Sequence, residues 1–138
     1  MLRVEILYPM CALAGLTGAV LLLIPLARFR AVAQGAVTAR DFALGESARV
    51  PEATRIPNRN FMNLLEVPLL FYVVSLSLYV TDTATSTALA LAWIYVALRA
   101  VHSAIHLTYN HVIHRLAAFA TSNFVLVALW ILFTTGLR

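Results

Sequence analysis

Residues 59–68 read RNFMNLLEVP and open a segment that is apolar enough to cross a membrane. Within it, Arg59, Asn63 and Glu66 are spaced by four and three residues, so these side chains share one face of a helix. An ionisable residue in a membrane-spanning helix is energetically costly and therefore marks a candidate functional site. This polar face predicts polar partners elsewhere in the chain.

The composition is that of an integral membrane protein. Of the 138 residues, 62% are hydrophobic and 12% are charged, and the mean hydropathy is +0.86. Soluble domains usually carry about 25% charged residues, and a chain of this length favours a single domain, residues 1–138. The net charge of +4 comes from ten arginines and no lysine, and most of these arginines flank apolar runs. This pattern favours a topology signal over nucleic-acid binding, and the Arg- and Ala-rich usage indicates a bacterial source.

Four apolar runs predict an all-α fold, an integral membrane four-helix bundle. We expect helices at about residues 5–30, 60–81, 84–109 and 115–137. The polar stretch between the first two helices is expected to be an irregular loop. Pro68 should loosen or bend the first turns of the second helix, because a proline removes a backbone hydrogen bond.

The distribution of arginines predicts the orientation in the membrane. Six arginines lie in the polar region of residues 28–60 that joins the first two helices, and Arg115 stands at the start of the fourth helix, whereas the hairpin at residues 81–87 has none. Since cytoplasmic loops carry an excess of positive charge, the arginine-rich loops should be cytoplasmic and both termini outside.

A second polar stripe is expected at the same depth as the first. Arg99, His102 and His106 are spaced by three and four residues on the third helix, and Asn110 continues this face. Glu66 and Arg99 each lie seven residues from the cytoplasmic end of a helix, or roughly 10 Å below that surface. We therefore predict that Glu66 and Arg99 face each other inside the bundle and pair.

The two stripes have three alternative interpretations. They could form a binding cleft that opens to the cytoplasm, or a hydrogen-bond network that joins two helices at about 0.6–2 kcal/mol per bond. The number of matched polar groups favours the cleft. The third possibility is a metal or haem carrier that uses His102 and His106 with Glu66. The neighbouring Arg99 would repel a cation, so we expect no metal site.

The motifs resemble those of the MAPEG superfamily, the membrane-associated proteins in eicosanoid and glutathione metabolism. The first motif is Arg-x3-Asn-x2-Glu followed by Pro, here at residues 59–68. The second is Arg-x2-His-x3-Tyr followed nine residues later by Arg, here at residues 99–115, with His106 where the family often has Tyr. The four spans, the long first loop and the short hairpin also match.

The resemblance implies a homotrimer that binds glutathione at the cytoplasmic side, between subunits. The implied glutathione-binding residues are Arg59, Asn63, Glu66, Arg99, His102 and His106. Arg115 would be catalytic and stabilise the thiolate, because a guanidinium lowers the pKa of a nearby thiol. Arg28 or Arg30 would reach the ligand of a neighbouring subunit.

The sequence therefore supports two hypotheses of different classes. The first is a glutathione-dependent transferase or peroxidase that acts on lipophilic electrophiles in a bacterial inner membrane. The second is a non-enzymatic membrane protein that binds a lipid or an amphiphile and holds a structural Glu–Arg network. In both, the partners are membrane lipid and a lipophilic small molecule.

Overall fold

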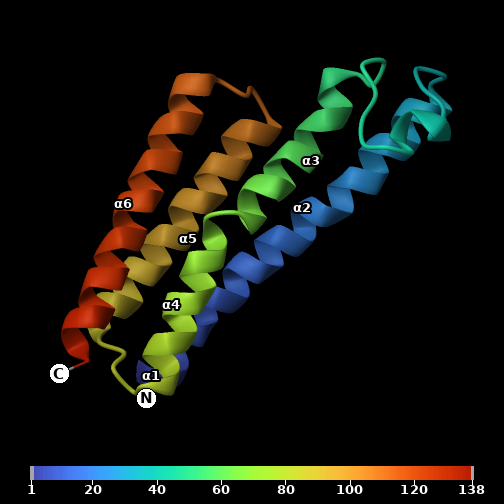
Figure 1. The fold of residues 1–138 in the computed structure, drawn as a ribbon. Coiled ribbons are helices and arrows are strands. Elements are labelled where there is room, and N and C mark those ends of the chain that lie inside the picture. Colours follow the sequence, from blue (N-terminus) through green and yellow to red (C-terminus); the bar gives the residue numbers. More distant parts are fainter. Residues whose placement is uncertain (1, 138) are drawn as a thin grey trace.

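The molecule is a bundle of long helices (Figure 1). The structure, a computed structural model, describes residues 2–137. Its elements in chain order are α1 (Leu2–Glu5), α2 (Leu7–Ala33), η1 (Ala39–Phe42), α3 (Glu52–Leu65), α4 (Pro68–Val80), α5 (Ser86–Leu107) and α6 (Val112–Gly136). Four described stretches are long and apolar enough to cross a membrane: Arg3–Ala33, Glu52–Val80, Ser86–Leu107 and Val112–Gly136. The predicted all-α, four-helix integral membrane fold is confirmed.

Apolar side chains fill the space between the helices. α5 packs most extensively against α6, and α2 packs along α3 (Figure 1). Leu13, Leu64 and Leu129 are completely buried in this core, where the rings of Phe71 and Tyr95 stack 4.5 Å apart. The outer faces carry many exposed large apolar side chains. Because water would disfavour such a surface, these faces suit contact with lipid tails.

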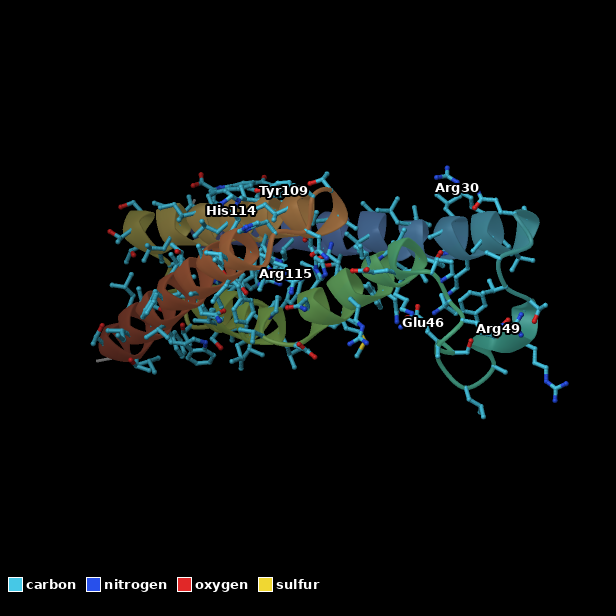
Figure 2. The ribbon with its side chains drawn as sticks, turned by 90° about the horizontal axis from the view of Figure 1, so that it is seen from above. Arg30, Glu46, Arg49, Tyr109, His114 and Arg115 are labelled. Carbon is cyan, nitrogen blue, oxygen red and sulfur yellow. The ribbon has the colours of Figure 1, made fainter. Side chains whose placement is uncertain are left out.

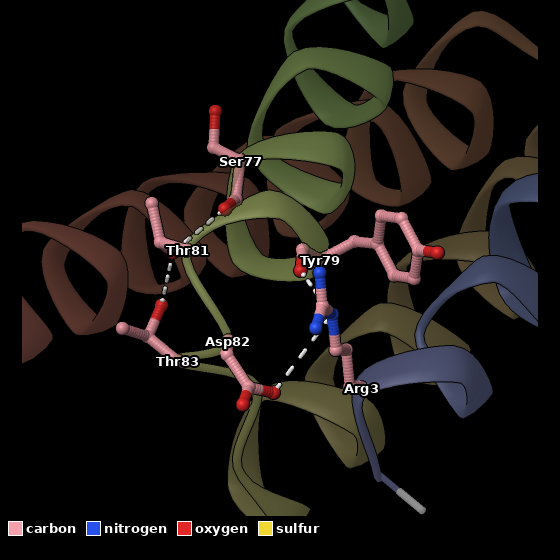
Figure 3. Close-up of polar contacts among 6 residues, drawn as sticks. All are labelled: Arg3, Ser77, Tyr79, Thr81, Asp82 and Thr83. Carbon is pink, nitrogen blue, oxygen red and sulfur yellow. Dashed lines mark hydrogen bonds and ion pairs between the residues drawn. The ribbon is translucent and has the colours of Figure 1, made fainter.

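The connections between the helices give the bundle two different ends. The α2–α3 and α5–α6 connections lie together at one end, and both termini and the α4–α5 turn lie at the other (Figure 1). We call the first the arginine-rich end; it carries loop 34–51 and turn 108–111. At the opposite end, Arg3 donates from Nε to the backbone oxygen of Tyr79 (3.0 Å) and lies 4.0 Å from Asp82 (Figure 3). These contacts tie the start of the chain to the α4–α5 turn.

The second span differs from its prediction at both its start and its middle. α3 begins at Glu52, where the sequence predicts an irregular loop up to residue 60. The predicted bend at Pro68 is a complete break: α3 ends at Leu65 and α4 begins at Pro68. Between them, Glu66 has a ψ angle of −98°, outside the helical region. Pro68 lacks an N–H and sits at the first position of α4, which is a favourable place for proline.

Candidate functional site

A polar cavity opens at the arginine-rich end, between α3, the end of α5 and the start of α6. Its volume is about 540 Å³, within the usual range for small-molecule sites. The lining residues are Glu52, Arg55, Ile56, Arg59, Asn63, His106, Asn110 and Arg115. Three arginines against one glutamate make this cavity electropositive, so it favours an anionic ligand.

A smaller and more apolar cavity adjoins the polar one. Its volume is about 230 Å³, and its lining residues are Asn63, His102, Val112, Arg115, Leu116 and Phe119. Asn63 and Arg115 line both cavities. Val112 and Leu116 are 63% and 60% exposed on the apolar face of α6, so the rim of this cavity belongs to the surface that lipid would cover.

Arg115 lies at the junction of the two cavities, and the first turn of α6 places it there. The backbone N–H of Arg115 donates to the oxygen of His111, the residue just before α6, over 3.0 Å. Its side chain donates from Nη1 to Oδ1 of Asn110 over 2.6 Å. Figure 2 shows the side chain between α3 and α6, while the exposed Tyr109 and His114 lie on the other side of this turn.

Arg99 is completely buried beside the cavities. Its Nη2 donates to the backbone oxygen of Asn63 over 2.9 Å, and its guanidinium lies 5.6 Å from the centre of the Phe119 ring. Within the described residues, Nε and Nη1 of Arg99 have no hydrogen-bond partner. A buried guanidinium with free donors is costly, so Arg99 is a candidate functional residue beside the cavities, although it lines neither of them.

The two histidines of α5 are divided between the cavities. His102 borders the apolar cavity and His106 the polar one, and their ring centres are 5.9 Å apart. Both are buried, and the Nδ1 atom of each lacks a hydrogen-bond partner in the described part of the chain. Over residues 2–137, no group of three or more His, Cys, Asp or Glu side chains is arranged to hold a metal ion. The pair thus offers polar contacts to a ligand of the cavities.

The predicted pair between Glu66 and Arg99 is wrong within this chain. Glu66 is exposed at the break between α3 and α4 and lines neither cavity. The described ion pairs are Arg3–Asp82 and Arg28–Glu46. The i, i+3 spacing aligns side chains only while a helix continues, and the backbone leaves the helix at Glu66 itself.

Arg28 and Arg30 also lie away from the two cavities. Arg28 pairs with Glu46 over 3.5 Å and stacks on the ring of Phe42 at 4.9 Å, while Arg30 is exposed near the end of α2 (Figure 2). Neither side chain lines the cavities of its own chain.

This region also contains residues outside the predicted set of site residues. Asn60 is completely buried and accepts a hydrogen bond from Ser103 over 3.2 Å, which joins α3 to α5. Asn110 and Phe119 contact the two arginines, and Arg55 adds a third positive charge to the polar cavity. Asn110 continues the predicted polar stripe of the third helix, and Asn60 and Arg55 are polar residues just outside an apolar run, which was the available signal for them. Phe119 lies inside an apolar run and carries no such signal.

The sequence model of the MAPEG family matches residues 6–135, which is nearly the whole chain. The chain belongs to the MAPEG family. MAPEG proteins are membrane proteins in glutathione and eicosanoid metabolism, and the four membrane-length helices agree with this membership. No curated protein and no solved structure matches the chain.

The structure of this MAPEG protein gathers most of the predicted site residues. Arg59, Asn63 and His106 meet Arg115 around the polar cavity, and His102 joins them at the apolar one. Arg99 lies directly behind this group, in contact with the backbone of Asn63. Glu66 alone points elsewhere, and Glu52 is instead the acidic residue at the polar cavity.

Proposed function

We propose that this MAPEG protein is a glutathione-dependent membrane transferase or peroxidase that acts on lipophilic electrophiles. The observation that carries the proposal is the position of Arg115, which borders both an electropositive polar cavity and a small apolar cavity. Glutathione is a peptide with two carboxylates and one ammonium group. Arg55 and Arg59 are suited to hold the carboxylates, and Glu52 is suited to hold the ammonium group.

The proposed chemistry needs a thiolate, and Arg115 supplies the charge that favours it. A guanidinium beside the sulfur lowers the thiol pKa and raises the thiolate fraction. In the transferase reaction, the thiolate attacks the electrophilic carbon, the new C–S bond forms, and the leaving group departs with its electron pair. In the peroxidase reaction, two glutathione molecules reduce a hydroperoxide to an alcohol and water and become a disulfide. The apolar cavity is suited to hold the lipophilic partner in either case.

We also propose that the chain works as a homotrimer with the arginine-rich end in the cytoplasm of a bacterium. Glu66 supports an oligomer, because its exposed carboxylate lies in the middle of the span Glu52–Val80. A carboxylate facing lipid at this depth is costly, and contact with another copy would relieve that cost. The protein would then lie in the inner membrane, and its polar cavity would receive glutathione from the cytoplasm.

Replacing Arg115 tests the proposal. In the purified protein, Arg115→Ala should lower kcat/KM for conjugation of a generic electrophile about 100-fold, because the charge that stabilises the thiolate is lost. Arg49→Ala is the matched control, since this exposed loop arginine borders neither cavity (Figure 2). Equal rates for wild type and Arg115→Ala would remove Arg115 from the mechanism, and the absence of saturable glutathione binding would remove the function itself.

A second candidate is a non-enzymatic protein that binds a lipid or an amphiphile. An apolar hollow of about 410 Å³ between α2 and η1 favours it; the hollow is lined by Ile24, Pro25, Arg28, Phe29, Val32, Ala39 and Phe42. The Glu66–Arg99 pair expected for this candidate does not form within the described chain, where Arg28 and Glu46 form a Glu–Arg ion pair instead. Mass spectrometry of the detergent-purified protein separates the candidates: a retained amphiphile without any glutathione turnover would favour the binding protein.

A further inference from the structure

The α5–α6 turn holds the guanidinium of Arg115 through one neutral side chain, that of Asn110. Oδ1 of Asn110 accepts a hydrogen bond from Nη1 of Arg115 over 2.6 Å. This distance is slightly shorter than the usual range of about 2.7–3.2 Å for N–H···O bonds, and a charged donor shortens such bonds. Asn110 and Arg115 both line the polar cavity, and Asn110 does not reach the apolar one. The contact therefore fixes one side of the guanidinium and leaves the other side at the junction.

The backbone of Asn110 is fixed by α5, so its side chain has a rigid base. Its N–H donates to the oxygen of Ile105 over 2.8 Å, which closes the end of α5. Its φ angle is +49°, in the left-handed region that asparagine adopts more readily than most residues. Arg115 is fixed separately by its backbone bond to His111 in the first turn of α6. The side-chain bond thus sets the arginine relative to α5 and its histidines.

The neutrality of Asn110 matters for the charge of the site. A carboxylate at this position would form an ion pair with Arg115 and compete with a bound thiolate for the guanidinium. An amide oxygen orients the guanidinium but leaves its positive charge uncompensated. Asparagine combines three properties that this position uses: it adopts the left-handed backbone readily, its short side chain carries a hydrogen-bond acceptor, and that side chain is uncharged.

We propose that Asn110 is a positioning residue that aims Arg115 at the thiol of the bound peptide without neutralising it. This inference rests on the proposed function, in which Arg115 stabilises a thiolate. Asn110 acts through Arg115 and needs no contact with the reacting atoms.

A double-mutant cycle in the full-length protein tests the proposal. Asn110→Gly keeps the left-handed backbone and removes the acceptor, so it should lower kcat about tenfold and change the KM for glutathione less than about threefold. In an Arg115→Ala background the same change should cause no further loss, because Asn110 acts through that arginine. Equal losses in both backgrounds, or no loss in either, would overturn the proposal.

A second variant and a matched control separate positioning from a purely structural role. Asn110→Asp should lower the rate at neutral pH more than Asn110→Gly and move the pH–rate profile to higher pH, since a paired guanidinium favours the thiolate less. A wild-type profile for Asn110→Asp would contradict the proposal. Asp82→Gly is the control: it removes a short polar side chain at the other described non-glycine residue with positive φ, at the opposite end of the bundle.

Chemical labelling tests the position of Arg115 without turnover. Phenylglyoxal should modify Arg115 several-fold faster in Asn110→Gly than in wild type or Asp82→Gly, because the guanidinium is released from its acceptor; mass spectrometry of peptides gives the rate. Unchanged labelling would overturn the positioning role. If wild type neither binds nor turns over glutathione, the proposed function fails, and the labelling result still decides what Asn110 does to Arg115.

Discussion

Arg99 is a buried charge whose neighbours in the described chain are a backbone oxygen and an aromatic ring. Such a group adds little stability, because the cost of removing it from water exceeds what these contacts return. The sequence predicted the depth of Arg99 in the membrane and the face of the helix on which it lies. It wrongly predicted Glu66 as the partner of Arg99 within the chain. That assignment depended on one continuous helix through residues 59–68, and no periodicity rule shows where a proline-containing helix breaks.

Replacing Arg99 by a neutral, unbranched side chain should separate stability from ligand binding. Arg99→Met should leave the unfolding midpoint without glutathione unchanged or higher, because a buried charge is replaced by an apolar group. The rise in midpoint caused by a given concentration of glutathione should shrink, since the stabilisation by a ligand decreases as its Kd rises. Thermal unfolding in detergent measures both quantities.

Tyr95→Phe is the control for Arg99→Met. It removes a buried hydroxyl that has no described hydrogen-bond partner, so both quantities should stay near their wild-type values. A large loss of stability in Arg99→Met without ligand would show instead that Arg99 is a structural residue.

At the scale of elements, the apolar runs predicted the membrane-spanning helices because burial in lipid needs a continuous apolar length. The start of α3 was missed because residues 52–60 are polar and contain Pro57. That proline and Thr54 are buried in the structure, so tertiary packing extends a helix that the local sequence does not favour. The break after Leu65 has a local cause at Pro68, so Asn63 and Arg59 belong to α3 and not to a helix that continues into α4.

Removing Pro68 should straighten this span. In Pro68→Ala, the new N–H can donate to the oxygen of Leu64, so the unfolding midpoint should rise. The realigned α3 should move Arg59 and Asn63 relative to Arg115, and kcat/KM for conjugation should fall about tenfold. Thermal unfolding and steady-state kinetics give the two values, with Pro25→Ala, at a proline inside α2, as the control. Full activity in a stabilised Pro68→Ala would show that the break does not shape the site.

Loop 34–51 should loosen in acid because Asp41 organises it. The backbone N–H of Thr38 and the hydroxyls of Ser47 and Thr38 donate to its carboxylate at 2.8–3.1 Å and hold the pKa of Asp41 below its ordinary value of 3.8. Because the folded pKa is the lower one, the stabilisation is complete above the ordinary value and is lost as the pH falls through the folded value.

Hydrogen exchange of the loop amides checks this prediction. In wild type, exchange relative to an unstructured peptide should stay constant at pH values well above 3.8 and increase as the pH falls below 3.8 and through the lower folded pKa of Asp41, where its carboxylate takes up a proton. Asp41→Asn should already be loose at pH values well above 3.8 and change less. Parallel behaviour of the two proteins would exclude Asp41 as the cause.

At the scale of the whole molecule, the connections agree with the order of spans read from the sequence: two turns gather at the arginine-rich end, and both termini lie at the other (Figure 1). The cavities could not be located from the sequence with the same accuracy, because their walls come from the ends of three helices whose exact bounds were uncertain by several residues. The polar stripes identified the helices, and the packing of those helices selected which members of each stripe meet.

The orientation of the molecule can be measured by cysteine labelling. In a Cys11→Ala background, a membrane-impermeant thiol reagent added to bacterial spheroplasts should label Asp82→Cys and leave Leu44→Cys unlabelled, because arginine-rich loops stay in the cytoplasm. Both positions are exposed in the structure, so permeabilised cells should show equal labelling. The reverse pattern would place loop 34–51 outside.

The apolar rim formed by Val112 and Leu116 has a consequence for the effective concentration of a lipophilic substrate. A molecule that reaches Arg115 across this rim arrives from lipid, so its relevant concentration is an amount per lipid and not per volume of water. Adding empty vesicles at constant total substrate would dilute it within the membrane, and the KM expressed per volume would rise with the amount of lipid. Glutathione, which stays in water, would show no such surface dilution.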